Sequence, residues 1–279
     1  MPELDWRSAG RETRSHSFQY TWKDVVLYAL GIGAQADELP FVYEKVPGGL
    51  KVFPSFAALA AGGLILDFAK RLEGNRFLHG EQMVRLHHPI PPQGKILATG
   101  RVTDVFDKGK SAVVVFQSQG HGEDGTHLFD VEHIAFHVGG GGFGGDPGPK
   151  TEPVHPPGGV EPDFRVRHKI PENQAALYRL SGDLNPLHID PEYAQGGGFA
   201  KPILHGLCTY GYATRAIVYG LCSGDVRRFK VFKARFSEVV YPGETLTTEG
   251  WQVEEGRFII QVRTDRAVVI SNAYAVVGP

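Results

Sequence analysis

Apolar and β-branched residues gather in two separate regions of the chain, and each region predicts several β-strands. In the first region, residues 97–106, 112–117 and 128–138 have this composition, and polar turns separate them. The second region repeats the pattern in four stretches, at residues 231–240, 245–253, 258–264 and 268–277. Because Gly, Pro and charged residues fill the intervening turns, the strands of each region are expected to run antiparallel.

A long apolar stretch precedes each set of strands and predicts a buried helix. Residues 55–70 and 206–219 are apolar around most of the helical circumference, which is typical of a helix enclosed by other elements. A buried helix followed by antiparallel strands indicates a sheet wrapped around that helix. Two such units in one chain predict an α+β fold.

Short matches between the two units suggest an internal duplication. Phe77-Leu-His-Gly80 matches Ile203-Leu-His-Gly206 at an offset of 126 residues, and Tyr28-Ala-Leu-Gly matches Tyr178-Arg-Leu-Ser at an offset of 150. The two offsets together predict about 24 extra residues in the first unit. We expect those residues to enlarge a binding site.

Glycine and proline are concentrated between the two units. Residues 139–149 read GGGGFGGDPGP, and a second Pro- and Gly-rich run follows, so neither a helix nor a central strand is expected there. A phosphate-binding loop would need Gly-Lys-Ser/Thr before a helix, and Asp-Pro stands there instead. The predicted organisation is a first unit at 1–138, a linker at 139–160 and a second unit at 161–279.

Composition and charge exclude several classes of protein. The 279 residues carry a net charge of −2, so no global positive field would attract nucleic acid. No stretch reaches the roughly 18 apolar residues that a membrane helix needs. Neither a signal peptide nor a Ser-Lys-Leu terminus is seen, and there are only two cysteines, so the expected location is the cytoplasm.

The densest polar segment is 180–190, which contains Asp183, Asn185 and His188. One interpretation is an ordinary turn, because Asp, Asn and Pro favour turns. The other is a catalytic loop in which Pro186 fixes the backbone and the three polar side chains are aimed at one water molecule. Composition alone leaves both interpretations open.

The motif Tyr178-x-Leu-Ser-Gly-Asp183-x-Asn185-Pro186-Leu-His188 resembles the signature of the MaoC-like, R-specific type 2 enoyl-CoA hydratases. The resemblance covers nearly the whole chain. Residues 77–82 and 89–92 look like the family's N-terminal half, and residues 203–211 and 228–236 look like its C-terminal half. It implies a double hotdog fold, in which two antiparallel sheets, each wrapped around a helix, are fused in one chain.

The resemblance also implies an activity, the reversible hydration of trans-2-enoyl-CoA to (3R)-3-hydroxyacyl-CoA. Asp183 and His188 match the family's acid–base pair, and Asn185 matches the residue that orients the water. Gly206 matches the backbone donor to the thioester oxygen. Such proton transfers are worth roughly 10²–10⁴ in rate. Which member of the pair is base and which is acid stays open, because coupled groups share their protons.

By resemblance, the second unit is catalytic and the first binds the acyl chain. Aligning Tyr28 with Tyr178 puts Gly33 opposite Asp183, so the first unit carries no acid–base set. The residues that match ligand-contacting positions of the family are His79, Gly80, Lys108, Leu184, Pro186, Leu187 and Phe236. The cationic run at 227–235 is either a solvated strand face or the border of an entrance for the CoA nucleotide. Acyl-CoA is the expected partner and a homodimer a further candidate, whereas neither nucleic acid nor a membrane is expected.

No cofactor or metal ion is expected. The chain has no dinucleotide fingerprint, and His87 and His88 with Glu81 lack the spacing of zinc ligands. Cys208 falls in a buried helix, where a free cysteine usually serves packing. The alternatives are a dehydratase that runs the reaction in reverse, a thioesterase of the same fold, and a non-catalytic acyl-CoA-binding module. The intact acid–base set favours a hydratase over the last two but does not separate it from a dehydratase.

Overall fold

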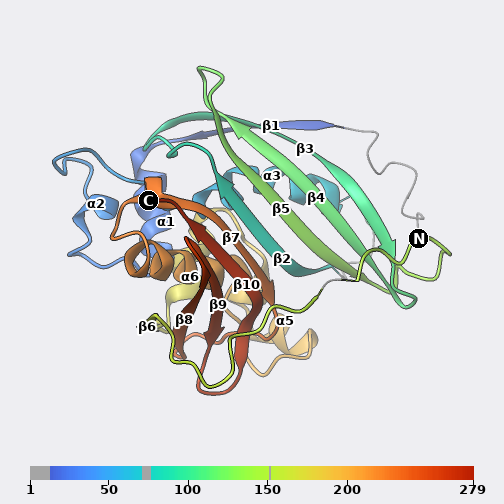
Figure 1. Cartoon of the computed structure of the whole chain (residues 1–279). Helices are drawn as coiled ribbons and strands as arrows, with labels where there is room; N and C mark the ends of the chain where they lie inside the picture. Colours follow the sequence, from blue (N-terminus) through green and yellow to red (C-terminus); the bar gives the residue numbers. More distant parts are fainter. Residues whose placement is uncertain (1–12, 71–76, 151) are drawn as a thin grey trace.

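A single ten-stranded antiparallel sheet, wrapped around two long helices, organises the molecule (Figure 1). The computed structural model describes residues 13–70, 77–150 and 152–279, without the side chains of 66–70. In spatial order, the first five strands are β1 (Arg14–Tyr20), β3 (Gly94–Asp107), β4 (Ser111–His121), β5 (His127–Val138) and β2 (Phe77–Leu86). The other five are β7 (Phe229–Phe236), β10 (Val268–Val277), β9 (Arg257–Arg263), β8 (Thr245–Glu254) and β6 (Phe164–Lys169).

The long helices α3 (Phe56–Lys70) and α6 (Gly206–Gly220) each belong to one unit. Shorter helices connect the elements: α1 (Trp22–Gly31), α2 (Leu39–Val42), α4 (Gln174–Tyr178), η2 (Arg179–Ser181), η3 (Pro186–His188), α5 (Pro191–Gly196) and η4 (Val226–Arg228). None of the helices in the described ranges is long and apolar enough to cross a membrane.

Most predicted elements are confirmed within a few residues. The strand expected at 231–240 is an exception, because β7 stops at Phe236. The Ser237 amide still donates to the Val269 carbonyl of β10, but further along, the Val240 carbonyl accepts a hydrogen bond from the Leu204 amide instead. The described part of the linker at 139–160 has neither helix nor strand, as expected.

The sheets of the two units join edge to edge between β2 and β7. Glu81 pairs with Arg235, and Met83 pairs with Lys233, in an antiparallel register. The double hotdog fold is thus confirmed, with one refinement: the two expected sheets form one continuous sheet.

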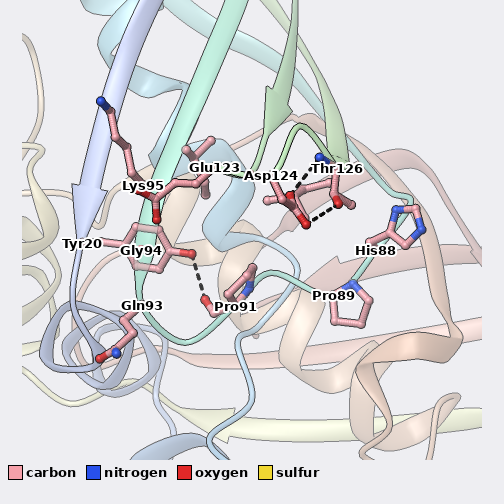
Figure 2. A pocket seen from close by; sticks show the side chains of 13 residues that line it. Tyr20, His88, Pro89, Pro91, Gln93, Gly94, Lys95, Glu123, Asp124 and Thr126 are labelled. Atoms are coloured by element: carbon pink, nitrogen blue, oxygen red, sulfur yellow. Dashed lines mark hydrogen bonds between the residues drawn. The ribbon is translucent and has the colours of Figure 1, made fainter.

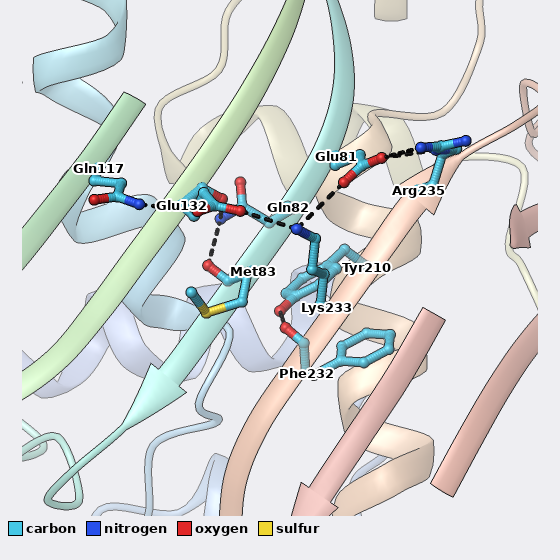
Figure 3. Close-up of polar contacts among 9 residues, drawn as sticks. All are labelled: Glu81, Gln82, Met83, Gln117, Glu132, Tyr210, Phe232, Lys233 and Arg235. Atoms are coloured by element: carbon cyan, nitrogen blue, oxygen red, sulfur yellow. Dashed lines mark hydrogen bonds and ion pairs between the residues drawn. The ribbon is translucent and has the colours of Figure 1, made fainter. Parts of the chain in front are cut away.

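An ion-pair network centred on the buried Glu81 crosses this seam (Figure 3). Glu81 is only 7% exposed, and its Oε1 accepts a hydrogen bond from Arg235 Nε at 2.7 Å. Lys233 Nζ lies 3.5 Å from Glu81 Oε2 and 3.0 Å from Glu132 Oε1. Burial of Lys233 opposes its charge, but Glu132 and Glu81 outweigh this and raise the pKa of its ammonium. Charged groups of β5, β2 and β7 therefore add ion pairs to the backbone ladder that joins the two units.

The sequence repeat has a constant offset of 150 residues over the first half of each unit. β1 begins at Arg14 and β6 at Phe164, while α3 begins at Phe56 and α6 at Gly206. The expectation of about 24 extra residues in the first unit is therefore wrong. It relied on matching residues 77–80 to residues 203–206, but the former begin a strand and the latter end at the start of a helix.

Candidate active site

A cavity of about 440 Å³ opens beside the N-terminus of α6, where both units meet. Its walls come from the loop before η3, the first turns of α6, the start of β2 and the segment after β7. The lining residues are Phe77, Leu78, His79, Asp183, Asn185, Leu187, His188, Phe199, Ile203, Leu204, Gly206, Leu207, Thr209, Phe236, Ser237, Glu238, Val239, Val240 and Val269. The fold thus gathers seven of the sequence-predicted site residues in one place, and most of the remaining wall is apolar.

The loop that carries Asp183 is fixed by its own hydrogen bonds. The Asn185 amide donates to Asp183 Oδ1 at 3.2 Å, and Asn185 Oδ1 accepts from the Leu187 amide at 3.0 Å. Pro186 then begins η3 with its ring-restricted φ. Because the Asn185 side-chain carbonyl is committed to this turn, its NH₂ group is the part that can donate to a bound molecule.

His188 is held in a single orientation by the backbone. Its Nδ1 lies 2.9 Å from the Ile203 carbonyl oxygen. Since a carbonyl only accepts, Nδ1 carries the hydrogen, and Nε2 of the neutral ring presents its lone pair. Burial lowers the pKa of His188, against the opposing effects of the Ile203 carbonyl and the Asp183 charge. The neutral ring can therefore accept a proton at Nε2.

His205, directly before α6, lies beside His188 and the Asp183 loop. It is 1% exposed, and its Nε2 donates to the Asp183 backbone carbonyl at 3.2 Å. Burial, reinforced by the neighbouring His188, lowers the pKa of His205 to about 4. Side-chain ligand atoms of Asp183, His188 and His205 all lie within 4.8 Å of one another. Of the His-Gly pair, the sequence predicted a role only for Gly206, so this contact of His205 to the Asp183 loop was missed.

Gly206 is the first residue of α6, where backbone N–H groups have no carbonyl within the helix to bond. The positive end of the helix dipole lies at the same point, so developing negative charge would be stabilised there. A Cβ added at Gly206 would meet the Phe236 ring at 3.6 Å, which is ordinary contact. Glycine is therefore not required for packing, and its absent side chain keeps the cavity open beside this helix end.

The first unit contributes Phe77, Leu78 and His79 to the described lining. The His79 ring stacks on His133 at 3.8 Å between centroids and meets the edge of Phe236 at 4.7 Å. Burial, followed by the charge of His133, lowers the pKa of His79 well below its usual value. A neutral imidazole thus forms part of the wall opposite the second unit's loop.

Four predicted ligand contacts lie outside this cavity lining: Gly80, Lys108, Leu184 and Pro186. Gly80 lies against the Phe136 ring, and the Lys108 ammonium donates to the Pro147 carbonyl in the linker. Leu184 is 59% exposed. The cationic run at 227–235 also stays out of the described lining, and its Lys233 and Arg235 belong to the ion-pair network at the seam.

The corresponding position of the first unit is closed. At the offset of 150 residues Gly33 matches Asp183, and Glu38 matches His188. A Cβ at Gly33, whose φ is +84°, would lie 2.3 Å from the Tyr212 ring. Glu38 is bound to the Arg215 guanidinium, with Nε 2.9 Å from Oε2. An acid–base pair like that of the second unit cannot be accommodated there.

Two further features have no part in the Asp183 cavity. The Cys208 thiol donates to the Gly31 carbonyl at 3.2 Å, and burial raises its pKa, so it is an inert packing group. A second cavity, of about 340 Å³, lies at the far end of the first unit between Tyr20, Pro91 and Asp124 (Figure 2). Its described lining includes none of the sequence-predicted site residues.

Comparison with known proteins gives one consistent relationship. Residues 18–139 match the MFE-2 hydratase 2 N-terminal domain, and residues 154–273 match the MaoC like domain. The probable enoyl-CoA hydratase 2 of Dictyostelium discoideum is 39% identical over 272 residues, which cover 94% of this chain and 92% of that protein.

Two solved structures extend this relationship to three dimensions. A MaoC-like dehydratase from Phytophthora capsici aligns with a TM-score of 0.86 at 32% identity, over 98% of this chain and 97% of that one. The full-length peroxisomal multifunctional enzyme type 2 of Drosophila melanogaster aligns with a TM-score of 0.82 at 37% identity. The match covers 95% of this chain but 48% of that enzyme, so the chain spans about half its length.

Proposed function

The chain belongs to the family of MaoC-like hydratase 2 proteins, and we propose that it catalyses the reversible hydration of trans-2-enoyl-CoA to (3R)-3-hydroxyacyl-CoA. It is an enoyl-CoA hydratase and, in the reverse direction, a 3-hydroxyacyl-CoA dehydratase. The observation that carries the site assignment is that Asp183, His188 and the N-terminus of α6 line one cavity. A carboxylate, a neutral imidazole and a helix N-terminus can supply the acid–base groups and the oxyanion donor that addition of water to an enoyl-thioester needs.

The acid–base step starts at His188 Nε2. With Nδ1–H held by the Ile203 carbonyl, Nε2 takes a proton from water as the water oxygen forms its bond to C3. The Asp183 carboxylate orients this water and stabilises the imidazolium that forms. The same proton then passes to C2, so that the elements of one water molecule are added and both side chains return to their starting state.

Electron density moves from the double bond to the thioester oxygen during attack at C3. The Gly206 amide at the start of α6 is the proposed donor to this oxygen. Removing such a donor costs roughly 10²–10³ in rate in other enzymes. The NH₂ group of Asn185, which lies in the same loop as Asp183, is proposed to hold the water or the thioester.

The two units are proposed to have different roles. We assign catalysis to 161–279 and acyl binding to 1–138, with the linker at 139–160 between them. The sealed position around Gly33 and Glu38 supports this assignment. His79, Leu187 and Phe236 are proposed substrate contacts on the cavity wall, while Gly80, Lys108, Leu184 and Pro186 would have to act from outside the described cavity.

Product configuration tests the proposed reaction. The purified protein is given trans-2-enoyl-CoA substrates of four to ten carbons, and each product is offered to an S-specific and to an R-specific 3-hydroxyacyl-CoA dehydrogenase with NAD. We expect NAD reduction only with the R-specific enzyme. Rapid reduction with the S-specific enzyme would contradict the stereochemical assignment, and no hydration of any substrate would favour a non-catalytic acyl-CoA-binding module.

Direction, compartment and assembly are further proposals. The equilibrium constant belongs to the reaction, so a dehydratase role differs only in which acyl-CoA is supplied. We keep the cytoplasm as the proposed location, although the related Drosophila enzyme is named as peroxisomal. We also keep a homodimer as a proposal, which light scattering of the purified chain would test.

A further inference from the structure

A second group of metal-binding side chains lies outside the cavity of Asp183. The Asp130 carboxylate on β5 is approached by two imidazoles, one on each oxygen. His87 Nε2 lies 2.8 Å from Oδ2, and His127 Nε2 lies 2.8 Å from Oδ1. One ligand atom from each of the three residues lies within 4.8 Å of the others. The three side chains are 27–34% exposed, so an ion can reach them from solvent.

The backbone fixes these side chains from separate strands. His127 begins β5 and is paired in register with His121 of β4, across the turn that joins the two strands. The His121 ring stacks on the His127 ring with centroids 4.8 Å apart and an angle of 17°. His87 follows the end of β2, and its amide donates to the Leu128 carbonyl at 2.8 Å.

Neighbouring residues, of which Figure 2 labels His88, Asp124 and Thr126, stiffen this part of the fold. His88 Nδ1 donates to the His127 carbonyl at 2.9 Å, so the segment after β2 is tied to the start of β5. In the turn before His127, the Asp124 carboxylate accepts hydrogen bonds from the Thr126 amide and hydroxyl. The three ligand atoms therefore belong to a preorganised part of the fold.

We propose that His87, His127 and Asp130 bind a divalent transition-metal ion, and that Zn²⁺ suits them best. Two imidazole nitrogens and a carboxylate oxygen are donors that zinc accepts readily. Ligand atoms around a tetrahedral zinc ion lie roughly 3.3 Å apart at ordinary bond lengths. The two imidazole–carboxylate separations are 2.8 Å, and all three ligand atoms lie within 4.8 Å of one another, so side-chain adjustments without a change of backbone can bring them around one ion. The fourth position falls to water.

The ion would act as a clip, that is, a cross-link between two segments of the fold. In its absence, each Nε2–H donates to Asp130. Binding moves the proton of each ring from Nε2 to Nδ1, so that the lone pair of Nε2 faces the ion while each imidazole stays neutral. Binding then links the segment after β2 to the start of β5, and a ligand that binds only the folded state raises its stability. Since none of the three residues belongs to the described lining of the Asp183 cavity, the clip does not depend on the proposed hydratase activity.

The experiment has to separate this site from the active site, because Asp183, His188 and His205 also bring ligand atoms within 4.8 Å of one another. Zn²⁺ bound per chain is measured by equilibrium dialysis, and melting temperature is followed in parallel. Tetrahedral Co²⁺ absorption provides a second signal. The variants are Asp130→Asn and His127→Gln, with Asp183→Asn to disable the other cluster. His155→Ala, at an exposed linker histidine, is the matched control.

We expect wild type, Asp183→Asn and His155→Ala to bind one Zn²⁺ that raises the melting temperature. In Asp130→Asn and His127→Gln the affinity should fall at least about tenfold, because even outer-shell changes at zinc sites cost 10–100-fold. The melting temperature of each variant without zinc shows whether it is folded. Zinc binding that survives both substitutions, that is lost only in Asp183→Asn, or that is absent from the wild type would overturn the proposal.

Discussion

The His205 ring stacks on the His188 ring, with 3.7 Å between centroids and 28° between planes. Through Nε2, His205 also supports the backbone carbonyl of Asp183. The two members of the proposed acid–base pair thus share one neighbour. Because burial holds the pKa of His205 near 4, this neighbour stays uncharged at neutral pH and does not repel the imidazolium that His188 forms during turnover.

The pH profile of kcat/KM tests the protonation state assigned to His188. Its ordinary pKa of 6.5 is lowered in the folded protein, so the neutral, proton-accepting form persists below pH 6.5. Activity should therefore be level through pH 6.5 and fall only at lower pH. An acidic limb centred above pH 6.5 would argue against a neutral His188 base. Melting temperatures over the same range separate loss of activity from unfolding.

Replacement of His205 tests its role as a positioning residue. His205→Ala removes the donor to the Asp183 carbonyl, and a single lost hydrogen bond is worth about 0.5–1.5 kcal/mol. We expect kcat to fall about tenfold with little change in KM, and His205→Gln, which keeps an N–H donor, to recover part of the loss. If both variants lose stability but keep the wild-type kcat, the residue serves packing alone.

A methyl group at Gly206 should separate stability from activity. Alanine is a better helix former than glycine, although at the first residue of α6 the gain is smaller than the roughly 1 kcal/mol of a helix interior, and the added Cβ would meet Phe236 only at ordinary contact distance. We expect Gly206→Ala to melt no lower than wild type, while turnover drops at least about tenfold because the methyl displaces the thioester from the helix N-terminus. Wild-type turnover in this variant would exclude close approach of the substrate to that amide.

The ion pairs at the seam between the units should affect the stability of the fold but not turnover. Glu81→Gln leaves Arg235 and Lys233 without their shared carboxylate, but both cations keep some contact with solvent. We therefore expect a loss of about 1 kcal/mol, seen as a melting temperature lower by roughly 2–4 °C, with unchanged kcat. Glu255→Gln, at an exposed carboxylate, is the control and should have no effect.

Buried apolar elements could be predicted from the sequence, and polar ones at the edges could not. α3 and α6 are enclosed by the sheet, so their apolar composition gave their bounds to within one residue. β1 and β6 lie at the two outer edges of the sheet, where alternate residues are polar and exposed, and neither was expected. β2 was missed because its Glu81 and Gln82 are buried at the seam, which no local pattern reveals.

The same difference between local and long-range information applies to the candidate site residues. Asp183, Asn185 and His188 are close in sequence, so one motif identified them together. His87 and Asp130 are 43 residues apart, and only the pairing of β2 with β5 brings them together. Glu81, the carboxylate considered with His87 in the sequence, points instead to Arg235 and Lys233.

Asp183 and His188 are proposed to act together on one water molecule. Their coupling predicts that a double variant, Asp183→Asn with His188→Gln, loses little more activity than the worse single variant, because residues that act as a unit are not additive. Independent roles would instead multiply the two losses.

The most direct measurement is kcat of Asp183→Asn with a trans-2-enoyl-CoA substrate, taken together with its melting temperature. Asparagine keeps the size of the side chain and the acceptor for the Asn185 amide, but it lacks the negative charge that supports proton transfer. We predict a folded protein with kcat lowered at least about 10²-fold. A folded Asp183→Asn protein that hydrates the substrate within a few-fold of the wild-type rate would contradict the account.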